Sequence, residues 1–577
     1  MTPSPAPDVP SDKSAYNRFL LIVAGLGGLL YGIDIGIIDP ALGYLGKTIS
    51  MTEENKSIIV AAVLGGSMFA SVIAGFFADL VGRKLMMLVS AVMFVASVAI
   101  IFTSQTYVPL LLGRLLQGMS GGVIAVVVPL YLAECLRADV RGKGTSIFQF
   151  MLTLGIVAAA LVGDYYTKRA EAAIDLAAGN EQAIMAAANH AWRGMFLAVI
   201  YPGILFFVGG FFISESPRWL YRKGRKEQAR KALLRSRTAA EAEFELAEME
   251  MALAHEHSKP KISVAESMKE IFTQRKYVIP FVLACVILGC NQATGINSIL
   301  GFMTTILQQA GLAAESASKS GLWIKILNTI MTVVAVMLVD RKGRKFLLKL
   351  GTSGIIVSLL AASAVFYSFE SKRVDVAAKI ETMVSANALD FDLTQVDLGN
   401  LVEAGQPAQL TILYSYGDKQ DIAVGISNDP RKKDIRISLS PDDKKNAGQP
   451  LKIIRARAGP VPTEKTGFLI AACLAVFISF FAVGPGVCVW LALSELMPTR
   501  IRSVGMGVAL LVNQGVSTGI AAFFLPIVGN YGYSAMFGFW AACTVVYFIT
   551  AAFFLPETKG RTLEEIEEHF EGRKLKN

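Results

Sequence analysis

The chain has 577 residues, of which 53% are hydrophobic and 18% are charged, and its mean hydropathy is +0.49. This composition excludes an ordinary soluble protein. The formal net charge of +9 fits the basic cytoplasmic loops of a membrane protein better than a nucleic-acid partner, and no such partner is predicted.

Twelve apolar runs are long enough to cross a lipid bilayer, which takes about 20 residues each. They lie at residues 18–40, 57–79, 85–104, 108–132, 145–163, 193–213, 277–300, 319–339, 346–368, 466–491, 503–528 and 533–555. We therefore predict an all-α membrane protein with twelve transmembrane helices. The polar tail before them, residues 1–17, shows no cleavable signal peptide and is predicted to be disordered.

Two charged loops recur along the chain. The pattern D-x-x-G-R-K occupies residues 79–84 and again residues 340–345, and a Glu lies seven residues before an Arg at both Glu134 and Glu495. Such repetition indicates a duplicated membrane protein, whose functional site is expected between its halves near the membrane midplane. It predicts a transporter with two six-helix halves, the first at residues 18–213 and the second at residues 277–368 and 466–555.

The spacing of these repeats locates an insertion in the second half. The D-x-x-G-R-K loops are 261 residues apart, whereas the two Glu residues are 361 apart. Residues 369–465 account for the difference, and they contain four short stretches of alternating apolar residues separated by turn residues. We predict a small, β-rich extracytoplasmic domain. Two roles stay open for it, a passive loop or a binding site for a partner or a glycan.

Basic residues set the predicted orientation. Short connections rich in Lys and Arg all fall on one side of the membrane if both termini are cytoplasmic. On that side lie a helical linker at residues 214–276 and a tail at residues 556–577, which contains a short amphipathic helix. The six cysteines lack metal-ligand spacing, and neither a metal nor a cofactor is predicted.

The duplicated charges predict ion pairs at the cytoplasmic end. Arg83 is expected to pair with a carboxylate on a neighbouring helix, in contacts that hold the inner ends of the two halves together and break when the inner side opens. The alternative is that these charges only set the topology. The predicted latch comprises Asp79, Arg83, Glu134, Arg141, Glu215, Arg218, Asp340, Arg344, Glu495, Arg502 and Glu557.

Nine motifs are spread over the chain outside the insertion. They are GGLLYGIDIGII (27–38), GFFADLVGRK (75–84), GRLLQGMSGG (113–122), PLYLAE with a later RG (129–142), ESPRWL (215–220), NQATGIN (291–297), DRKGRK (340–345), GPGVCVW (484–490) and PETKGRTLEE (556–565). The chain thereby resembles the major facilitator superfamily (MFS) and, within it, the sugar porters, for which ESPRWL and PETKGR together are specific. The resemblance implies the MFS fold, with a central cavity that opens alternately to each side.

The resemblance also implies a set of sugar ligands. Amides inside the membrane are costly unless they serve packing or a ligand. The matching positions are Gln149, Gln292, Asn297 and Trp490 as ligands, Phe481 and Tyr31 on the apolar side, and Asn291, Asn513 and Gln514 as further amides. Asn291 stands where the family usually has a second Gln, and residues 301–302 replace a pair of tyrosines that the resemblance places at the outer gate. Hexose, pentose and polyol stay open as substrates.

One acidic residue bears on proton coupling. Asp34 lies in the middle of the first span, where lipid penalises a charge, and Arg114 in the fourth span is its expected partner. Breaking that pair would change the affinity of the carboxylate for a proton. An acid at this position resembles proton-coupled sugar porters, whereas many uniporters of the family carry Asn; a purely structural ion pair is the alternative. Asp39, at the outer end of the same span, is expected to be solvated.

The resulting prediction is a monomeric importer of a monosaccharide, hexose or pentose, in symport with a proton. The alternatives are a facilitative sugar or polyol uniporter and a non-transporting sugar receptor. An enzyme is disfavoured, because the four His residues lie outside the predicted spans and no nucleophile–base motif appears. The sequon Asn55-Lys56-Ser57 is the only outward-facing one, which favours a bacterial inner membrane over a eukaryotic plasma membrane.

Overall fold

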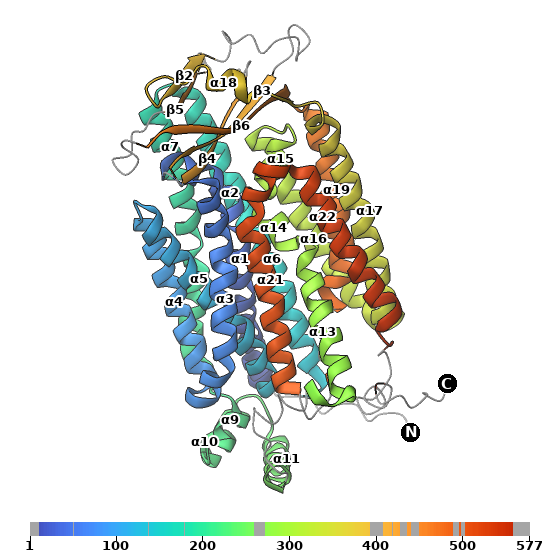
Figure 1. Cartoon of the computed structure of the whole chain (residues 1–577). Coiled ribbons are helices and arrows are strands. Elements are labelled where there is room, and N and C mark those ends of the chain that lie inside the picture. Colours follow the sequence, from blue (N-terminus) through green and yellow to red (C-terminus); the bar gives the residue numbers. More distant parts are fainter. Residues whose placement is uncertain are drawn as a thin grey trace.

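The computed structural model describes residues 11–49, 51–136, 138–177, 179–258, 272–392, 408–417, 419–426, 436–439, 449–488, 496–497, 502–557 and 570. Within these ranges, twelve helical spans are long and apolar enough to cross a membrane. The predicted fold class is therefore confirmed. Figure 1 shows the spans as one bundle, with short helices at one end and β-strands at the other.

The first half contains eight helices that form six spans. They are α1 (Ser11–Gly36), α2 (Ile38–Thr48), α3 (Glu53–Val81), α4 (Arg83–Thr103), α5 (Tyr107–Cys135), α6 (Ala138–Leu176), α7 (Glu181–Ala198) and α8 (Ile200–Phe212). Helix α2 extends the first span beyond Gly36, and α7 with α8 makes up the sixth span.

The second half repeats this plan with a broken first span. Its helices are α13 (Arg275–Ala293), α14 (Ile296–Gly301), α15 (Met303–Gln309), α16 (Ala314–Lys342), α17 (Arg344–Glu370), α19 (Glu464–Val483), α21 (Arg502–Tyr531), α22 (Tyr533–Ile549) and the π-helical turn η1 (Thr550–Phe554). Gly295 has a φ of +83° and separates α13 from α14. The helix is thus interrupted between Ala293 and Ile296, and interrupted spans are common at binding sites in transporters.

Glycine allows the tightest helix contacts of the first half. A Cβ atom added to Gly32 of α1 would lie 1.9 Å from the Leu152 carbonyl oxygen of α6, and one added to Gly118 of α5 would lie 2.1 Å from the Val63 carbonyl oxygen of α3. Since lipid gives helices no hydrophobic drive to associate, such close backbone packing is what holds the pairs together. These glycines belong to the packing of the bundle.

Two helix pairs make the largest contacts between the two halves. Helix α3 packs against α21 and α6 packs against α16. The α3–α21 contacts run from the Leu525 N–H, which donates to the Ser57 hydroxyl oxygen, to mid-helix, where an added Cβ at Gly515 would lie 3.7 Å from the Met68 sulfur.

The short helices that follow the first half define what we call the linker end of the bundle (Figure 1). They are α9 (Pro217–Arg222), α10 (Lys226–Leu234) and α11 (Ala239–Ser258). The ring of Trp219, with Leu220, Ala229 and Ala232, forms a small apolar core between α9 and α10. Buried Arg237 fastens this unit to the bundle, because its guanidinium donates to the Cys135 carbonyl oxygen at 3.1 Å and to Glu245 at 2.6 Å.

The insertion forms a compact β-domain at the opposite end of the bundle, which we call the β-domain end (Figure 1). Its elements are β1 (Val374–Asp375), α18 (Ala377–Glu381), β2 (Leu389–Asp392), β3 (Ala408–Tyr416), β4 (Lys419–Ile426), β5 (Arg436–Leu439) and β6 (Leu451–Pro460). Four strands pair in the order β1-β6-β3-β4, and β2 pairs with β5. All of these pairings are antiparallel. Strands β3 to β6 overlap the four stretches predicted from alternation.

The two ends of the β-domain lie beside each other. Strand β1, which follows α17, pairs with β6, which precedes α19, with Val374 opposite Ala458. The domain also has a core of its own, built on Ile380, Leu410, Ile412 and Ala456, each 0% exposed. Because the ends of the β-domain are adjacent, a short linker can join α17 to α19 in its place.

We predict that replacing residues 374–460 by a short Gly/Ser linker leaves the helical bundle folded. Thr463, which caps α19 by accepting the Thr466 N–H, is retained. Circular dichroism of the purified protein in detergent should lose its strand signal, while the thermal midpoint of its helical signal stays close to that of the full chain. A trimmed chain that aggregates or melts far below the full chain would show that the bundle needs the β-domain.

Candidate functional site

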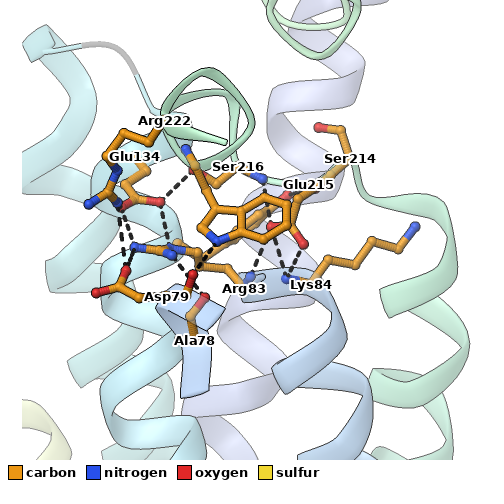
Figure 2. Close-up of polar contacts among 11 residues, drawn as sticks. Ala78, Asp79, Arg83, Lys84, Glu134, Ser214, Glu215, Ser216 and Arg222 are labelled. Atoms are coloured by element: carbon orange, nitrogen blue, oxygen red, sulfur yellow. Dashed lines mark hydrogen bonds and ion pairs between the residues drawn. The ribbon is translucent and has the colours of Figure 1, made fainter. Parts of the chain in front are cut away.

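A network of charges closes the linker end of the first half (Figure 2). Arg83, at the start of α4, is 1% exposed and donates to Asp79 at 2.6 Å and to the Ala78 carbonyl oxygen at 2.9 Å. Its Nε lies 2.8 Å from a carboxylate oxygen of Glu134 on α5. Glu134 also accepts bonds from the Ser216 hydroxyl and, at 3.1 Å, from Arg222 of α9. The network therefore ties α3, α4, α5 and α9 together.

Both D-x-x-G-R-K loops share the same backbone hydrogen-bonding arrangement. Gly82 and Gly343 have φ values of +106° and +87°, which only glycine adopts without strain. The next two backbone N–H groups donate to a carboxylate from a later segment, Glu215 in the first half and Glu557 in the second. Burial raises the pKa of Glu215, while bonds from the Ser216, Lys84 and Arg83 N–H groups oppose that rise. A carboxylate at a helix N-terminus satisfies free N–H groups and faces the positive end of the helix dipole.

The contacts of Arg83 differ from the predicted latch in one respect. Its carboxylate partners, Asp79 and Glu134, belong to the first half and do not bridge to the second. Arg218, a member of the predicted latch, is exposed, whereas Arg222, one turn later on α9, contacts Glu134. Glu495 and the side chains of Arg141, Asp340 and Arg502 lie outside the described residues.

Amide side chains gather where the broken span meets α21. The Gln292 side chain donates to Asn513 at 3.2 Å, and Asn297 donates to Gln292 at 2.9 Å and to Ser517 at 2.7 Å. Asn513 in turn donates to the Leu288 carbonyl oxygen at 3.1 Å. The structure thus joins Gln292, Asn297 and Asn513 into one cluster, as a site for polyhydroxylated ligands would require.

The other predicted ligands lie around this cluster to different degrees. Tyr31 of α1 has its hydroxyl close to Gln514 of α21, so the two halves meet there. Asn291 is buried, and its side-chain oxygen has no hydrogen-bond partner among the described residues. Phe481 stacks on Phe477 within α19, with ring centroids 6.2 Å apart. Gln149 is half-buried on α6, and Trp490 lies outside the described residues.

Asp34 is completely buried and makes no direct ion pair with Arg114. Both of its carboxylate oxygens lack a hydrogen-bond partner within the described part of the chain. Arg114 instead donates to the Gln117 side-chain oxygen at 2.6 Å, one turn along α5. An added Cβ at Gly121, the next position on that face, would lie 3.0 Å from an Asp34 carboxylate oxygen. Arg114 therefore bonds Gln117 rather than Asp34, although it remains near enough to act on the Asp34 carboxylate electrostatically.

Asp39 is not solvated, contrary to the prediction. It is 3% exposed and binds Lys325 of α16 at 2.6 Å. Sequence reasoning missed this pair because its members are 286 residues apart. One signal was available: Lys325 is a charge inside the apolar run 319–339, and such a charge needs a partner.

The described residues contain no group of three or more His, Cys, Asp and Glu side chains able to hold a metal ion.

The sequence and the fold both match known proteins. A family model described as "Sugar (and other) transporter" matches residues 20–386 and 453–570. The chain belongs to this sugar transporter family. The unmatched residues 387–452 lie within the insertion, so this part of it is not included in the family model. Members of the family are transporters and not enzymes, and the twelve spans make this chain a multi-pass membrane protein.

Several curated relatives are similar over nearly their whole length. A glucose transporter of Staphylococcus epidermidis is 26% identical, covering 96% of this chain and 97% of its own. The galactose-proton symporter of Escherichia coli is 26% identical, covering 98% and 97%, and probable inositol transporter 2 of Arabidopsis thaliana is 27% identical, covering 98% and 93%. The xylose transporter XylE of Escherichia coli, in a partially occluded inward-open conformation, shares the fold with a TM-score of 0.66 at 19% identity, covering 95% of this chain and 100% of its own.

For this sugar transporter family member, we predict that Arg83→Ala lowers the thermal stability in detergent. The change leaves buried Glu134 without its closest cation, and breaking a buried ion pair costs about 3–5 kcal/mol. Arg218→Ala, which removes an exposed Arg from the same region, is the matched control and should leave the thermal midpoint unchanged. Equal midpoints for the two variants would show that the network adds nothing to stability.

Proposed function

We propose that this protein imports a monosaccharide by alternating access, in symport with a proton. The observation that carries the proposal is the position of Asp34, a fully buried acid without a hydrogen-bond partner among the described residues. It lies on the same helix as Tyr31, which reaches Gln514 of the second half. A proton site and a sugar site would then share one helix.

The amide cluster supports sugar as the substrate. Gln292, Asn297 and Asn513 offer donors and acceptors that sugar hydroxyls can bind in pairs, and Tyr31 and Phe481 add aromatic faces. Relatives with glucose, galactose and arabinose in their names agree with this class. Inositol transporters are equally similar, and the unpartnered oxygen of Asn291 leaves an acceptor for one more hydroxyl. A cyclic polyol is therefore the second candidate.

The unpaired state of Asp34 supports proton coupling. Burying an ionised carboxylate without a partner is very costly, whereas a protonated one avoids most of that cost. Arg114 is held by Gln117 in this conformation. Turning the Arg114 guanidinium toward Asp34 would stabilise the ionised form and release the proton, so the Arg114 side chain would act as the switch.

The contacts between the halves support an inward-facing state. They lie at the β-domain end and mid-bundle, and the basic loops gather at the linker end, which we assign to the cytoplasm. We place both termini on that side and the β-domain outside. A bacterial inner membrane and a monomeric state complete the proposal.

Gln292→Ala should weaken sugar binding without unfolding the protein. It removes an amide that lies between Asn297 and Asn513, and a lost hydrogen bond of about 1 kcal/mol weakens the Kd about fivefold. The measurement is a titration of purified protein with glucose, galactose, arabinose and myo-inositol in turn. Gln308→Ala, at an exposed position of α15, is the control. An unchanged Kd for the Gln292 variant would remove this residue from the site.

Asp34→Asn should uncouple sugar movement from proton movement. The amide keeps the shape of the side chain but cannot take up a proton. In proteoliposomes, sugar-driven proton entry and accumulation of sugar against its gradient should vanish, while exchange of labelled sugar between the two sides persists. A pH-sensitive dye and labelled sugar are followed on the same vesicles.

The matched control is Asp164→Asn, which changes a buried acid of α6 that pairs with Lys168 at 2.7 Å. It should leave proton flux intact. An Asp34→Asn variant that still concentrates sugar under a proton gradient would place the coupling group elsewhere. Wild-type protein that moves sugar without proton flux would make the chain a uniporter.

A further inference from the structure

Asp39 binds two elements of the opposite half. From α2 of the first half, one carboxylate oxygen accepts the Lys325 ammonium of α16 at 2.6 Å, and the other accepts the Thr304 backbone N–H of α15 at 2.7 Å. The side chains of Lys325 and Asp39 are 1% and 2% exposed. By contrast, Arg83 pairs with carboxylates of its own half.

The surroundings of this pair are dry and tightly closed. Ile38 and Leu42 of α2 and Met303 and Ile324 of the second half are buried in the same apolar cluster. The two residues that replace the tyrosines of the family also lie in this contact. A Cβ added to Gly301 would lie 2.9 Å from a Val60 methyl group, and the Phe302 ring is fully buried with its centroid 4.7 Å from that of Phe524. A side chain at position 301 would therefore require the Val60 side chain to shift.

We propose that the Asp39–Lys325 ion pair is the latch of the outer gate in this transporter. Helices α2 and α15 lie at the β-domain end of the bundle (Figure 1), which the proposed orientation places outside. Opening that end moves α2 away from α15 and α16, so the pair must separate in every transport cycle. The inference rests on the alternating-access part of the proposed function and is independent of the sugar and of proton coupling.

The ion pair stabilises the fully closed gate relative to half-open conformations, so the gate is either closed or open. When the gate is closed, each charge is compensated by the other and by the Thr304 N–H. When the gate is open, both charges are hydrated. A half-open gate would leave one charge dry and unpaired, which is the arrangement that costs most. The pair therefore disfavours leaky intermediates, and either charge alone opposes closure.

The test uses electron paramagnetic resonance distances on the full chain in liposomes. Spin labels are attached through p-acetylphenylalanine at exposed positions 47 and 313 for the outer side, and 80 and 342 for the inner side. This chemistry leaves the six native cysteines in place. The variants are Asp39→Asn, Lys325→Met and the double variant, and Lys56→Met is the control because its partner Glu53 lies on the same helix at 2.5 Å.

Each single variant should lengthen the outer distance and shorten the inner one, because the remaining charge opposes the closed gate. The double variant should return to the wild-type distances, and Lys56→Met should leave them unchanged. Wild-type distances in both single variants, or a double variant displaced as far as the single ones, would overturn the proposal. Because these distances do not depend on transport, they can support the latch even if proton coupling fails.

A cross-linking experiment tests the same proposal if the single variants do not fold. Asp39→Cys/Lys325→Cys removes both charges together and is treated with a reducible bifunctional methanethiosulfonate. Uptake should be lost on cross-linking and restored by reductant, while wild-type protein with its own cysteines is unaffected by the same treatment. A cross-linked chain that transports as fast as the reduced one would show that residues 39 and 325 need not separate.

Discussion

Close backbone packing between glycine-bearing helices is the constraint on which the rest of this structure depends. In lipid, apolar side chains gain little by meeting each other, so helices stay together through close contact and internal hydrogen bonds. The Gly32–Leu152 and Gly118–Val63 contacts bring α1 onto α6 and α5 onto α3. The same approach places Gly121 of α5 against Asp34 and leaves room for that acid and for Tyr31. The shape of the candidate site therefore depends on glycines that lack a side chain as well as on the amide side chains.

The buried charges fall into two kinds, which differ in how completely they are compensated. Arg83 contacts Asp79, Glu134 and the Ala78 carbonyl oxygen at a rigid end of one half. Asp34 has no such contacts among the described residues, although it is equally buried. A satisfied network holds helices in place, whereas an unsatisfied group stores free energy that a proton or a rearrangement can release. The charge network around Arg83 and the proposed coupling residue Asp34 therefore lie at different levels of the same half.

Much of the fold could be predicted from the sequence, because apolar runs, a duplicated loop and an offset between repeats are local or periodic signals. The twelve spans and the β-rich insertion have this origin. The side-chain partners could not be predicted in the same way. A repeat shows that Arg83 has a role, but not that its carboxylates belong to its own half. One turn of α9 separates exposed Arg218 from Arg222, which is the residue that reaches Glu134. Asp39 was misjudged because its position at a helix end suggested water, while its partner lies in another span.

The pairing of β1 with β6 also has a mechanical consequence. Both connections of the β-domain lead into the second half, to α17 and α19, and the Arg455 side chain donates to the Asn530 carbonyl oxygen of α21, in the same half. A force applied to the β-domain, for example by a bound partner, would therefore be transmitted through β1 and β6 to the second half of the bundle. In the alternating-access cycle that we propose, a domain anchored in this way would move together with the second half of the bundle.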